Sequence, residues 1–317
     1  MAITTLTINP AIDLTLEVDS VIVEDVNRVQ EYSEVAGGKG INVSLVLNKF
    51  KIKQLDTLAL LGGQRGLRFK RLLSQKGLRL TPVQIKNETR VNVVAFDRTA
   101  HKTTKFNQKG PNLTKREEVQ LIALSHQKAL KSQYFIISGS LLPNMKKDWY
   151  KQLILKNKDG STHWIVDADG DVLKETLKAK PFLIKPNVHE AERVLKTKIK
   201  SDKDVWKAAR QFQKLGAQNV ALSLGSKGAC LLDSNGNRWR GFSVPVKVHS
   251  TIGAGDSFLA GIVYKLHQKK DFKEALRFGL ACGTHTAMTH ASELCDPKEV
   301  KKILKKIKVI KVNEQII

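Results

Sequence analysis

Short apolar runs of strand length alternate with helical patterns along most of this chain, and few folds accommodate that alternation. The strand-length runs are Thr4–Ile8, Leu55–Leu61, Tyr134–Ser138, Trp164–Ala168, Phe182–Ile184 and Val220–Leu224. The helical patterns are Gly40–Phe50, Leu67–Lys76, Lys115–Leu130, Asp202–Leu215 and a pair in Gly255–His290, joined near Lys270–Asp271. Nearly continuous apolar strands are buried on both faces, so this order predicts an α/β fold in which helices cover both faces of a mostly parallel sheet.

Two segments depart from this alternation. Asp13–Val35 and Val91–Phe106 carry alternating patterns with no helix between their strands. We interpret them as extra strands, at about 13–35 and 90–107, that project from the main sheet as a small lid. No linker, repeat or low-complexity tract interrupts the sequence, so residues 1–317 are expected to form a single domain.

The chain is strongly basic, with 54 Lys and Arg against 30 Asp and Glu, a formal net charge of +24. Such an excess suits either a nucleic acid or anionic surface as partner, or an enzyme whose ligands are phosphorylated. Aromatic residues make up only 6% of the chain, which does not favour nucleic acid. The dense run Lys298–Lys311 has apolar residues at helical spacing up to Ile307, so it predicts a helix whose lysines face solvent.

The remaining composition indicates a cytoplasmic globular protein. A hydrophobic fraction of 41% excludes general disorder, and no run approaches the ~20 apolar residues of a membrane helix. The segment Met1–Pro10 is interpreted as a first strand instead of a signal peptide. Cys230, Cys282 and Cys295 have no metal-type spacing and fit a reducing compartment.

The sharpest motif is Gly253-Ala254-Gly255-Asp256, at the start of a predicted helix. Small residues let the backbone approach a ligand closely, and the free N–H groups at a helix N-terminus bind anions such as phosphate. Asp256 would then lie beside that anion and could accept a proton from an attacking hydroxyl. Taken alone, the motif also fits a helix with an acidic first turn.

Two further motifs lie near the N-terminus. Ala36-Gly37-Gly38-Lys39-Gly40-Ile41-Asn42 again opens a helix, without the spacing of a P-loop. Lys39 could meet a phosphate and Asn42 a hydroxyl, although a plain loop-to-helix junction has the same residues. Asp13 follows the end of the first predicted strand, where open α/β sheets bind ligands, and a carboxylate there can bind vicinal hydroxyls.

These motifs occur in the order found in one family. The pair Gly-Gly-Lys-Gly-Ile-Asn and Gly-Ala-Gly-Asp resembles the two signatures of the ribokinase-like, or PfkB-type, carbohydrate kinases. Three intermediate stretches agree: Ile137-Ser138-Gly139-Ser140, Lys185-Pro186-Asn187 followed by Glu190, and Ser223-Leu224-Gly225-Ser226-Lys227-Gly228. The resemblance covers Thr4 to about Val309 and implies the three-layer α/β/α ribokinase-like fold with a lid of β-strands.

The resemblance also implies site residues and cofactors. Asp256 is the expected base, and the amides of Gly253, Ala254 and Gly255 form an anion hole. Asp13, Gly38 and Asn42 are expected to bind the sugar hydroxyls. ATP and Mg²⁺ are the implied cofactors, with Asn187 and Glu190 positioning the metal, through water. The implied nucleotide-binding residues are Lys185, Ser223, Gly225, Gly228, Gly255 and Gly283.

Within the family the chain looks most like the 1-phosphofructokinases and tagatose-6-phosphate kinases. Asn9-Pro10-Ala11-Ile12-Asp13 and Thr89-Arg90-Val91-Asn92 are among the stretches that resemble this branch. A phosphorylated substrate needs cations in its pocket, so Arg90 and Lys39 are expected to bind its phosphate, with Arg28 and Ser138 as weaker candidates. Of the two activities, the resemblance favours conversion of fructose 1-phosphate to fructose 1,6-bisphosphate, with tagatose-6-phosphate kinase as the alternative.

Other functions are also compatible with the sequence. A non-catalytic sugar-phosphate binder would keep this fold, and a nucleic-acid-binding protein is suggested by net charge alone. A kinase of nucleosides or unphosphorylated sugars leaves Lys39 and Arg90 without a role.

The chain departs from the family at Asp167-Ala168-Asp169-Gly170, where Asp-Thr-Ser-Gly is more usual. Exposed lid strands would favour a homodimer.

Overall fold

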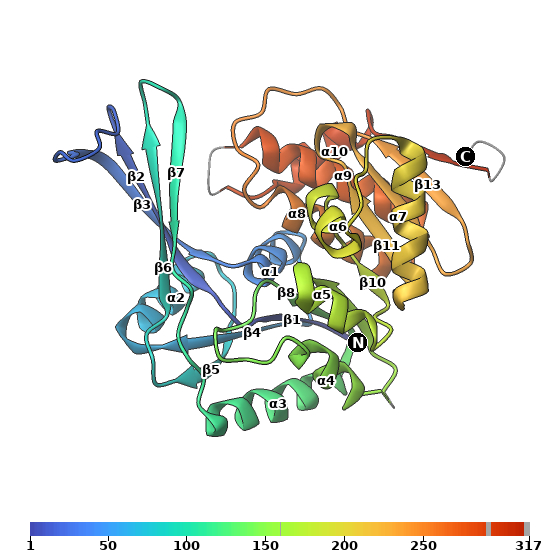
Figure 1. Cartoon of the computed structure of the whole chain (residues 1–317), viewed down its shortest axis with the longest axis horizontal. Coiled ribbons are helices and arrows are strands. Elements are labelled where there is room, and N and C mark those ends of the chain that lie inside the picture. The colour runs from blue at the N-terminus through green and yellow to red at the C-terminus, as the bar shows by residue number, and fades with distance from the viewer. Residues whose placement is uncertain (159, 290–292, 314–317) are drawn as a thin grey trace.

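The computed structural model describes residues 1–158, 160–289 and 293–313. Within these residues the strands form two separate sheets, one large and one small. Figure 1 shows the large sheet running through the body of the molecule, with the small sheet projecting from one end. Among the described helices, none is long and apolar enough to cross a bilayer.

The large sheet confirms the predicted mostly parallel arrangement. Its strands, in spatial order, are β5 (Thr81–Ile85), β4 (Leu55–Gly62), β1 (Ala2–Thr7), β8 (Ser132–Ser138), β9 (His163–Asp167), β10 (Leu183–Ile184), β11 (Asn219–Ser223), β12 (Ala229–Leu232), β13 (Arg238–Phe242) and β14 (Lys308–Lys311). Neighbours from β5 to β11 are parallel. Neighbours from β11 to β14 are antiparallel, an edge that the sequence analysis did not predict.

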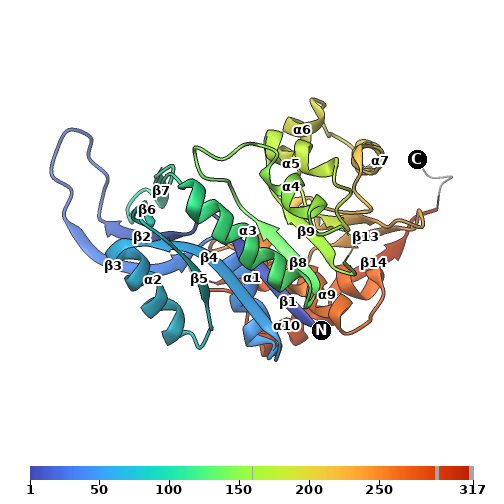
Figure 2. The same cartoon turned by 90° about the horizontal axis from the view of Figure 1, so that it is seen from below.

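Helices cover both faces of this sheet (Figures 1 and 2). One face packs against α3 (Lys115–Ala129), α4 (Trp149–Leu155), α5 (Gly170–Leu177), α6 (Val188–Leu195) and α7 (Asp202–Leu215). The other packs against α1 (Lys39–Lys49), α2 (Gly63–Gln75), α8 (Ala254–His267), α9 (Phe272–Met288) and α10 (Pro297–Leu304). A single 3₁₀ turn, Gly225–Lys227, follows β11.

The apolar strands are buried on both sides, as predicted. In β8, Phe135 and Ile137 pack into the core under α3 to α7, whereas Ile136 packs into the core under α8 and α9. In β4, Leu58 and Leu61 likewise face opposite layers. Alternate residues of a strand point to opposite faces, so a strand between two helical layers needs apolar residues at nearly every position.

One predicted helix is shorter than expected. The pattern from Lys298 to Lys311 predicts a helix that includes Ile307, but α10 ends at Leu304. A turn follows, in which Lys306 N–H donates to the Ile303 carbonyl, and the chain then pairs with β13 as strand β14. Ile307 is buried in the core from this turn, so the apolar spacing was correct but the helical interpretation of its last residue was wrong.

The small sheet comes from the two segments that alternate without helices. Its order is β3 (Val29–Gly37), β2 (Ala11–Val18), β6 (Arg90–Asp97) and β7 (Lys102–Asn107). β2 is parallel to β6, while β3 and β7 pair antiparallel at the two edges. The register places Asp13 opposite Asn92, and Asn92 opposite Asn107. One face of the small sheet therefore carries a polar row across three strands.

Candidate functional site

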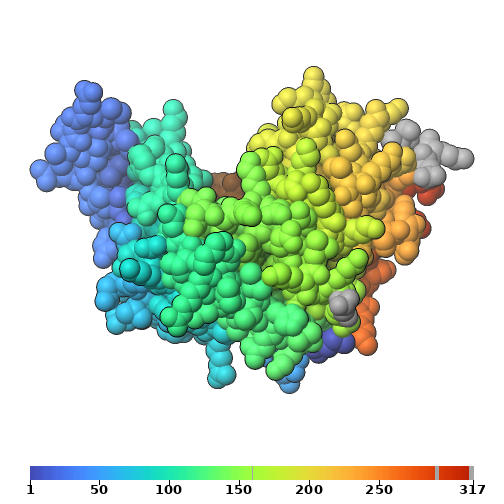
Figure 3. Space-filling view, turned by 60° about the horizontal axis from the view of Figure 1, so that its bottom comes forward, coloured from blue at the N-terminus to red at the C-terminus, as the bar shows by residue number. Residues whose placement is uncertain are grey.

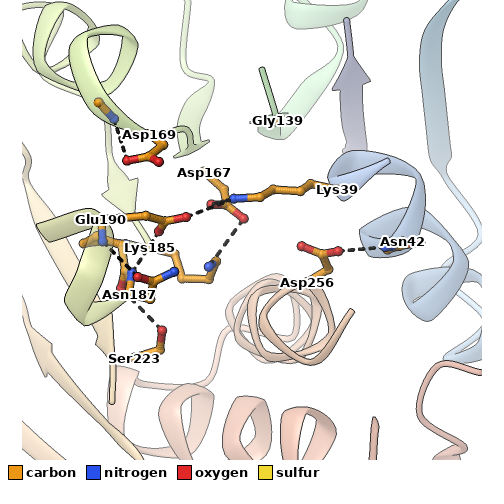
Figure 4. A network of polar contacts seen from close by, with 12 residues as sticks. Lys39, Asn42, Gly139, Asp167, Asp169, Lys185, Asn187, Glu190, Ser223 and Asp256 are labelled. Atoms are coloured by element: carbon orange, nitrogen blue, oxygen red, sulfur yellow. Dashed lines mark hydrogen bonds and ion pairs between the residues drawn. The ribbon is translucent and has the colours of Figure 1, made fainter. Parts of the chain in front are cut away.

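The predicted site residues gather where the parallel strands end and helices begin. β8 ends at Ser138, β9 at Asp167 and β10 at Ile184, directly before Lys185. Parallel strands end at the same edge of a sheet, and ligands of open α/β sheets bind beyond that edge. The helices α1, α6 and α8 start from the same region, as Figure 4 shows. Figure 3 shows the surface hollowed between the small sheet and the yellow segment that includes α7.

Asp256 lies in the first turn of α8 and is buried, with 8% of its surface exposed. Its Oδ2 accepts a hydrogen bond of 2.8 Å from Nδ2 of Asn42 on α1. Burial, followed by the nearby Asp167 carboxylate, raises the pKa of Asp256 to about 6, although Asn42, Lys185 and Lys39 act in the opposite direction. A carboxylate with this pKa is ionised at neutral pH and basic enough to accept a proton.

The glycines around Asp256 shape the start of α8. Gly253 is the N-cap residue, with a φ of 74°, and a Cβ at this position would lie 2.6 Å from Cδ2 of Leu294. A Cβ on Gly255 would lie 3.4 Å from Nζ of Lys185. No side chain caps the first turn of α8. The Ala254 N–H donates to the Thr251 carbonyl at 3.3 Å, whereas the N–H groups of Gly255 and Asp256 remain for an anion beside Lys185.

Asp167 is a member of this site that the sequence analysis did not select. It is fully buried at the end of β9, and its two oxygens lie 3.0 Å from Nζ of Lys39 and 3.4 Å from Nζ of Lys185. The same Lys39 ammonium lies 3.3 Å from Oε1 of Glu190. Figure 4 shows Lys39 reaching across from α1 toward these two carboxylates, with Asp256 beside it.

The charge on Lys39 is therefore already balanced within the site. Burial would lower the pKa of Lys39, but the carboxylates of Asp167, Glu190 and Asp256 outweigh burial and raise that pKa above its ordinary value. Lys39 stays protonated and lies between the carboxylates of Asp167 and Glu190. Its expected role at the substrate's phosphate stays a prediction.

Asn187 and Glu190 begin α6 as a reciprocal cap. Asn187 Oδ1 accepts from the Glu190 N–H at 2.9 Å, and Glu190 Oε2 accepts from the Asn187 N–H at 2.9 Å. This pairing fixes the Glu190 carboxylate, which is almost fully buried, with its Oε1 toward Lys39. Asn187 also bridges to Ser223 at the end of β11.

The carboxylates here fit a magnesium ion that is held partly through water. Within the described ranges, no cluster of three or more His, Cys, Asp or Glu could hold a metal by itself. Mg²⁺ commonly takes one or two carboxylates, keeps several waters and completes its shell with phosphate oxygens. Glu190 and Asp167, two carboxylates that share the Lys39 ammonium, are donors of the kind that such a shell uses.

Asp13 lies at the base of the small sheet, facing a cavity of about 410 Å³. Its Oδ1 accepts a 2.8 Å hydrogen bond from Nδ2 of Asn92, and any Cβ on Gly37 would overlap its carboxylate. Burial raises the pKa of Asp13, and the hydrogen bond from Asn92 and the charge of Arg90 oppose that rise. Asn42 and Gly253 line the same cavity, so it connects Asp13 with the start of α8.

Gly38 has a φ of 132° and abuts Thr7, where a Cβ would lie 2.8 Å from Cγ2. This close approach brings the start of α1 down onto the end of β1. A side chain at Gly38 would strain both the backbone and this contact.

The remaining substrate candidates differ in position. Arg90 begins β6, and its guanidinium donates to the carbonyls of Gln108 and Asn9 at 2.7 and 3.0 Å. Ser138 is fully buried, and its hydroxyl has no hydrogen-bond partner among the described residues. Arg28 is exposed and precedes Val29, which pairs with Val18 at the end of β2 away from Asp13. Within one chain, the structure does not bring Arg28 to the other candidates.

The predicted nucleotide-binding residues lie in different environments. Lys185 is buried beside Asp167, and Gly225, with a φ of 60°, has open space where a Cβ would lie. Ser223 accompanies Asn187 at the end of β11. Gly228 packs against the Gly241 carbonyl, and a Cβ on Gly283 would lie 3.0 Å from the Ala254 carbonyl. Chain packing therefore requires glycine at position 228, where φ is 97° and a Cβ would lie 2.2 Å from the Gly241 carbonyl, and leaves little room for a side chain at position 283.

Comparisons with known proteins agree along the whole chain. The family model "pfkB family carbohydrate kinase" matches residues 6–299. A 1-phosphofructokinase of Borreliella burgdorferi is 32% identical over 305 residues, 96% of this chain and 97% of that protein. A tagatose-6-phosphate kinase of Staphylococcus epidermidis is 31% identical over 315 residues, 98% of this chain and 100% of that one. The crystal structure of phosphofructokinase-2 from Escherichia coli in complex with fructose-6-phosphate superposes with a TM-score of 0.87 at 29% identity, covering 96% of this chain and 98% of that one. This chain belongs to the pfkB family of carbohydrate kinases.

Proposed function

We propose that this protein transfers the γ-phosphoryl group of ATP to a hydroxyl of a ketose phosphate, with fructose 1-phosphate as the preferred acceptor. The observation that carries the proposal is the placement of Asp256, buried beside the uncapped N-terminus of α8 and hydrogen-bonded to Asn42. Asn42 and Gly253 connect this carboxylate to the cavity that contains Asp13. An acceptor held there would contact a hydroxyl-binding carboxylate, Asp13, and would lie next to Asn42 and Gly253, which adjoin the base and the anion-binding backbone.

The reaction follows from these positions. Asp13, Gly38 and Asn42 hold the sugar hydroxyls and orient one of them toward Asp256. The hydroxyl oxygen forms a bond to the γ-phosphorus, its proton passes to Asp256, and the bond from phosphorus to the ADP oxygen breaks. The backbone N–H groups of residues 253–255 stabilise the charge on the transferring phosphoryl group.

We expect Lys185 to contribute positive charge on the nucleotide side of the site, and Lys39 to contribute it toward the substrate's phosphate. Both contact Asp167, and Lys39 also contacts Glu190. Magnesium held through water by Asn187, Glu190 and Asp167 would neutralise charge on the nucleotide phosphates. Ser223 and Gly225 line the nucleotide site in this proposal, while Arg90 and Ser138 face the acceptor.

The relatives support the substrate class and leave two acceptors in competition. One relative is named for fructose 1-phosphate chemistry and another for tagatose 6-phosphate, at similar identity. We favour fructose 1-phosphate and keep tagatose 6-phosphate as the alternative. The two ketoses differ in one stereocentre and in the position of the phosphate, so a few side chains decide between them.

The test is ADP release with magnesium-ATP and, separately, fructose 1-phosphate, tagatose 6-phosphate, fructose 6-phosphate and fructose. Asp256→Asn is the matched control, because it removes the base and keeps the shape. We expect preferential turnover of fructose 1-phosphate, and loss of about 10²-fold or more in the variant with nucleotide binding retained. Equal turnover by the variant would refute the role of Asp256. No turnover by the native protein would leave a sugar-phosphate binder or, if it binds RNA or DNA tightly at physiological salt, a nucleic-acid partner.

We also propose that the small sheet is a lid on the single domain of residues 1–317, and that two copies of the chain pair through it. Its edge strands and the β2–β3 connection expose large apolar side chains: Val21, Ile22, Val23, Val26, Val29, Tyr32 and Phe106. Burying such a surface against a second copy protects both edges. A monomer in light scattering at micromolar concentration would refute the dimer. The free, buried thiols of Cys230, Cys282 and Cys295 agree with the proposed cytoplasmic location.

A further inference from the structure

Two of the cysteines meet where α8, α9 and α10 pack together. Cys282 lies on α9, and Cys295 directly precedes Asp296, the N-cap residue of α10. Neither side chain is exposed to solvent, and the two thiols contact each other. The pair therefore joins one helix to the segment that leads into the next.

Backbone and hydroxyl contacts place the two cysteines together independently of their thiols. A Cβ on Gly261 of α8 would lie 2.9 Å from Sγ of Cys282, so this thiol faces α8. One turn farther along α9, Oγ1 of Thr286 donates to Oγ of Ser257 at 2.7 Å and accepts from the Cys295 N–H at 3.0 Å. Residues four apart lie on the same face of a helix, so the face of α9 that carries Cys282 also holds the backbone of Cys295.

The segment of Cys295 also forms part of the wall of the candidate site. Leu294 lines the cavity of about 410 Å³, and its Cδ2 lies 2.6 Å from the position that a Cβ on Gly253 would take. Nζ of Lys49 holds the carbonyls of Leu294 and Cys295 at 2.7 and 3.3 Å. A displacement of Cys295 would therefore reach the first turn of α8 through Leu294.

The two thiols differ in acidity. Contact with the Cys282 thiol lowers the pKa of Cys295, and the charge of Lys49 acts in the same direction, whereas burial opposes both. Burial, followed by contact with Cys295, raises the pKa of Cys282 well above its ordinary value. Because the thiolate is the nucleophile in thiol oxidation, Cys295 is the thiol that reacts first and Cys282 is the one that reacts second.

We propose that Cys282 and Cys295 are an oxidation site, at which hydrogen peroxide converts the two thiols to a disulfide that slows the kinase. The Cys295 thiolate attacks one peroxide oxygen, the O–O bond breaks, and a sulfenic acid forms. The hydroxide that leaves combines with the proton that Cys295 released and becomes water. The Cys282 sulfur then bonds to the Cys295 sulfur, the S–O bond breaks, and the oxygen leaves with the Cys282 proton as a second water. The two sulfurs together lose two electrons, which the peroxide gains.

The disulfide changes the site because bonded sulfur atoms lie closer together than thiols in contact. Cys295 and Leu294 would move toward α9, and the packing of Leu294 against Gly253 at the start of α8 would change. This inference rests on the proposed function, in which that first turn binds the transferring phosphoryl group. Disulfides of cytosolic proteins are usually transient and redox-sensing, so a reversible bond agrees with the proposed location.

The test treats the reduced protein with hydrogen peroxide and then with dithiothreitol. Free thiols and ADP release with fructose 1-phosphate are measured at each stage. After peroxide, the native protein should keep one of its three thiols, and mass spectrometry should find the peptides of Cys282 and Cys295 linked. Turnover should fall by about 10-fold or more, because a small misplacement near the reacting centre has an effect of that size. Dithiothreitol should restore the thiols and the rate.

Three variants serve as controls. Cys230→Ala removes a buried thiol on β12 that is outside the pair, so it should respond to peroxide as the native protein does. Cys295→Ser keeps a hydroxyl in place of the attacking thiol, and its rate should be unaffected by peroxide. Cys282→Ala removes the second thiol together with the contact that lowers the pKa of Cys295, so it should form no linked peptides and keep its rate.

The thiol and activity measurements separate this inference from the proposed function. If the native protein keeps all three thiols in excess peroxide, the oxidation site is refuted whatever the activity. A disulfide that leaves turnover unchanged would refute the link to α8, and equal inactivation of the native protein and Cys295→Ser would place the sensitive group elsewhere. If the native protein turns over no sugar phosphate, the proposed function fails, yet linked peptides of Cys282 and Cys295 would still support the oxidation site.

Discussion

Nδ2 of Asn42 donates a 2.8 Å hydrogen bond to Oδ2 of Asp256. The two residues lie in the first turns of α1 and α8, so the contact joins two helix N-termini that come from distant parts of the sequence. A hydrogen bond to the ionised form of a carboxylate lowers its pKa, and here it opposes the larger effect of burial. Asn42 therefore helps keep the proposed base ionised at neutral pH.

The first prediction concerns the pH dependence of turnover. Burial raises the pKa of Asp256 to about 6, and only the ionised carboxylate accepts a proton. As pH falls through that value the base is lost, so kcat/KM should fall on the acid side with an apparent pKa of about 6. Asn42→Ala removes an interaction that lowers the pKa of Asp256, so the acid limb of the profile should move to higher pH.

Asn48→Ala, on the same helix but bonded to the carbonyls of Lys76 and Gly77, is the control for this shift. Its profile should coincide with that of the native protein. A loss of activity in Asn42→Ala that is equal at every pH would mean that Asn42 only binds substrate. Stability gives an independent check: folding raises the pKa of Asp256, so the folded state disfavours the carboxylate, and Asp256→Asn should stabilise the protein above about pH 6 and have little effect near pH 4.

The second prediction concerns the buried ion pair between Lys185 and Asp167. Their side chains are only 4% and 0% exposed, and Lys185→Met leaves a buried carboxylate with one cation fewer. We expect the free energy of unfolding in urea to fall by about 3 kcal/mol, because an uncompensated buried charge is costly. Adding Asp167→Asn should recover part of this loss, since the second change removes the charge left behind.

Lys147→Met is the matched control. Lys147 pairs with Asp171, and their side chains are 69% and 64% exposed. Solvent screens such a pair, so this variant should lose less than about 1 kcal/mol. Equal losses for the two lysines would contradict the view that the charge network of the site is coupled to folding.

Local sequence periodicity predicted some elements of the fold and missed others. Apolar periodicity predicted the main strands and helices, because burial on one or two faces determines local composition. The strands β12 to β14 were missed, since antiparallel edge pairing depends on partners that are distant in sequence, such as β13 and β14. The Ile307 turn was missed for the same reason: a buried residue at helical spacing can be buried by another element.

The same distinction between local patterns and distant contacts applies to the site residues. Motifs located Asp256 and Asp13, because each stands at an element terminus with a recognisable local pattern. Asp167 and Asn92 act through partners on other elements, Lys39 and Asp13, which no local pattern reveals. Their signals in the sequence were position and inclusion in two stretches that were compared with the family, Asp167-Ala168-Asp169-Gly170 and Thr89-Arg90-Val91-Asn92. Gly228 shows the converse, since a family motif does not reveal that glycine at this position is required by packing.

The third prediction assigns Asn92 a positioning role. It donates to Asp13 and thereby orients the carboxylate and opposes the rise of its pKa by burial. Asn92→Ala should raise KM for the ketose phosphate by about tenfold or more, because a hydrogen bond to a charged group contributes about 1.5–3 kcal/mol, with a smaller effect on kcat. Asn92→Asp should be worse, because two carboxylates would then face each other across β2 and β6.

Thr104→Ala, exposed on the outer face of β7, should leave both constants unchanged. The pH profile distinguishes positioning from general damage to the small sheet. Without the hydrogen bond from Asn92, the pKa of Asp13 should rise, so the increase in KM should be larger near pH 5 than near pH 8. A KM increase of the same size at both pH values would indicate that Asn92 supports only the strand.

The fourth prediction concerns the start of α8. Gly253 has a φ of 74°, a left-handed conformation, and Gly253→Ala would place a Cβ 2.6 Å from Leu294. The conformation costs roughly 1–2 kcal/mol for alanine and the contact forces a local shift, so stability should fall by about 2–3 kcal/mol. Gly236→Ala separates these effects, because Gly236 has a φ of 81° and no atom within 4 Å of its Cβ position. That control should lose only the conformational part and keep its kcat.

For Gly253→Ala, kcat should fall as well, because the displaced turn carries the N–H groups that are proposed to bind the transferring phosphoryl group. A variant with reduced stability and unchanged kcat would show that catalysis does not depend on the position of this turn, and the anion hole would then have to be sought elsewhere in the site.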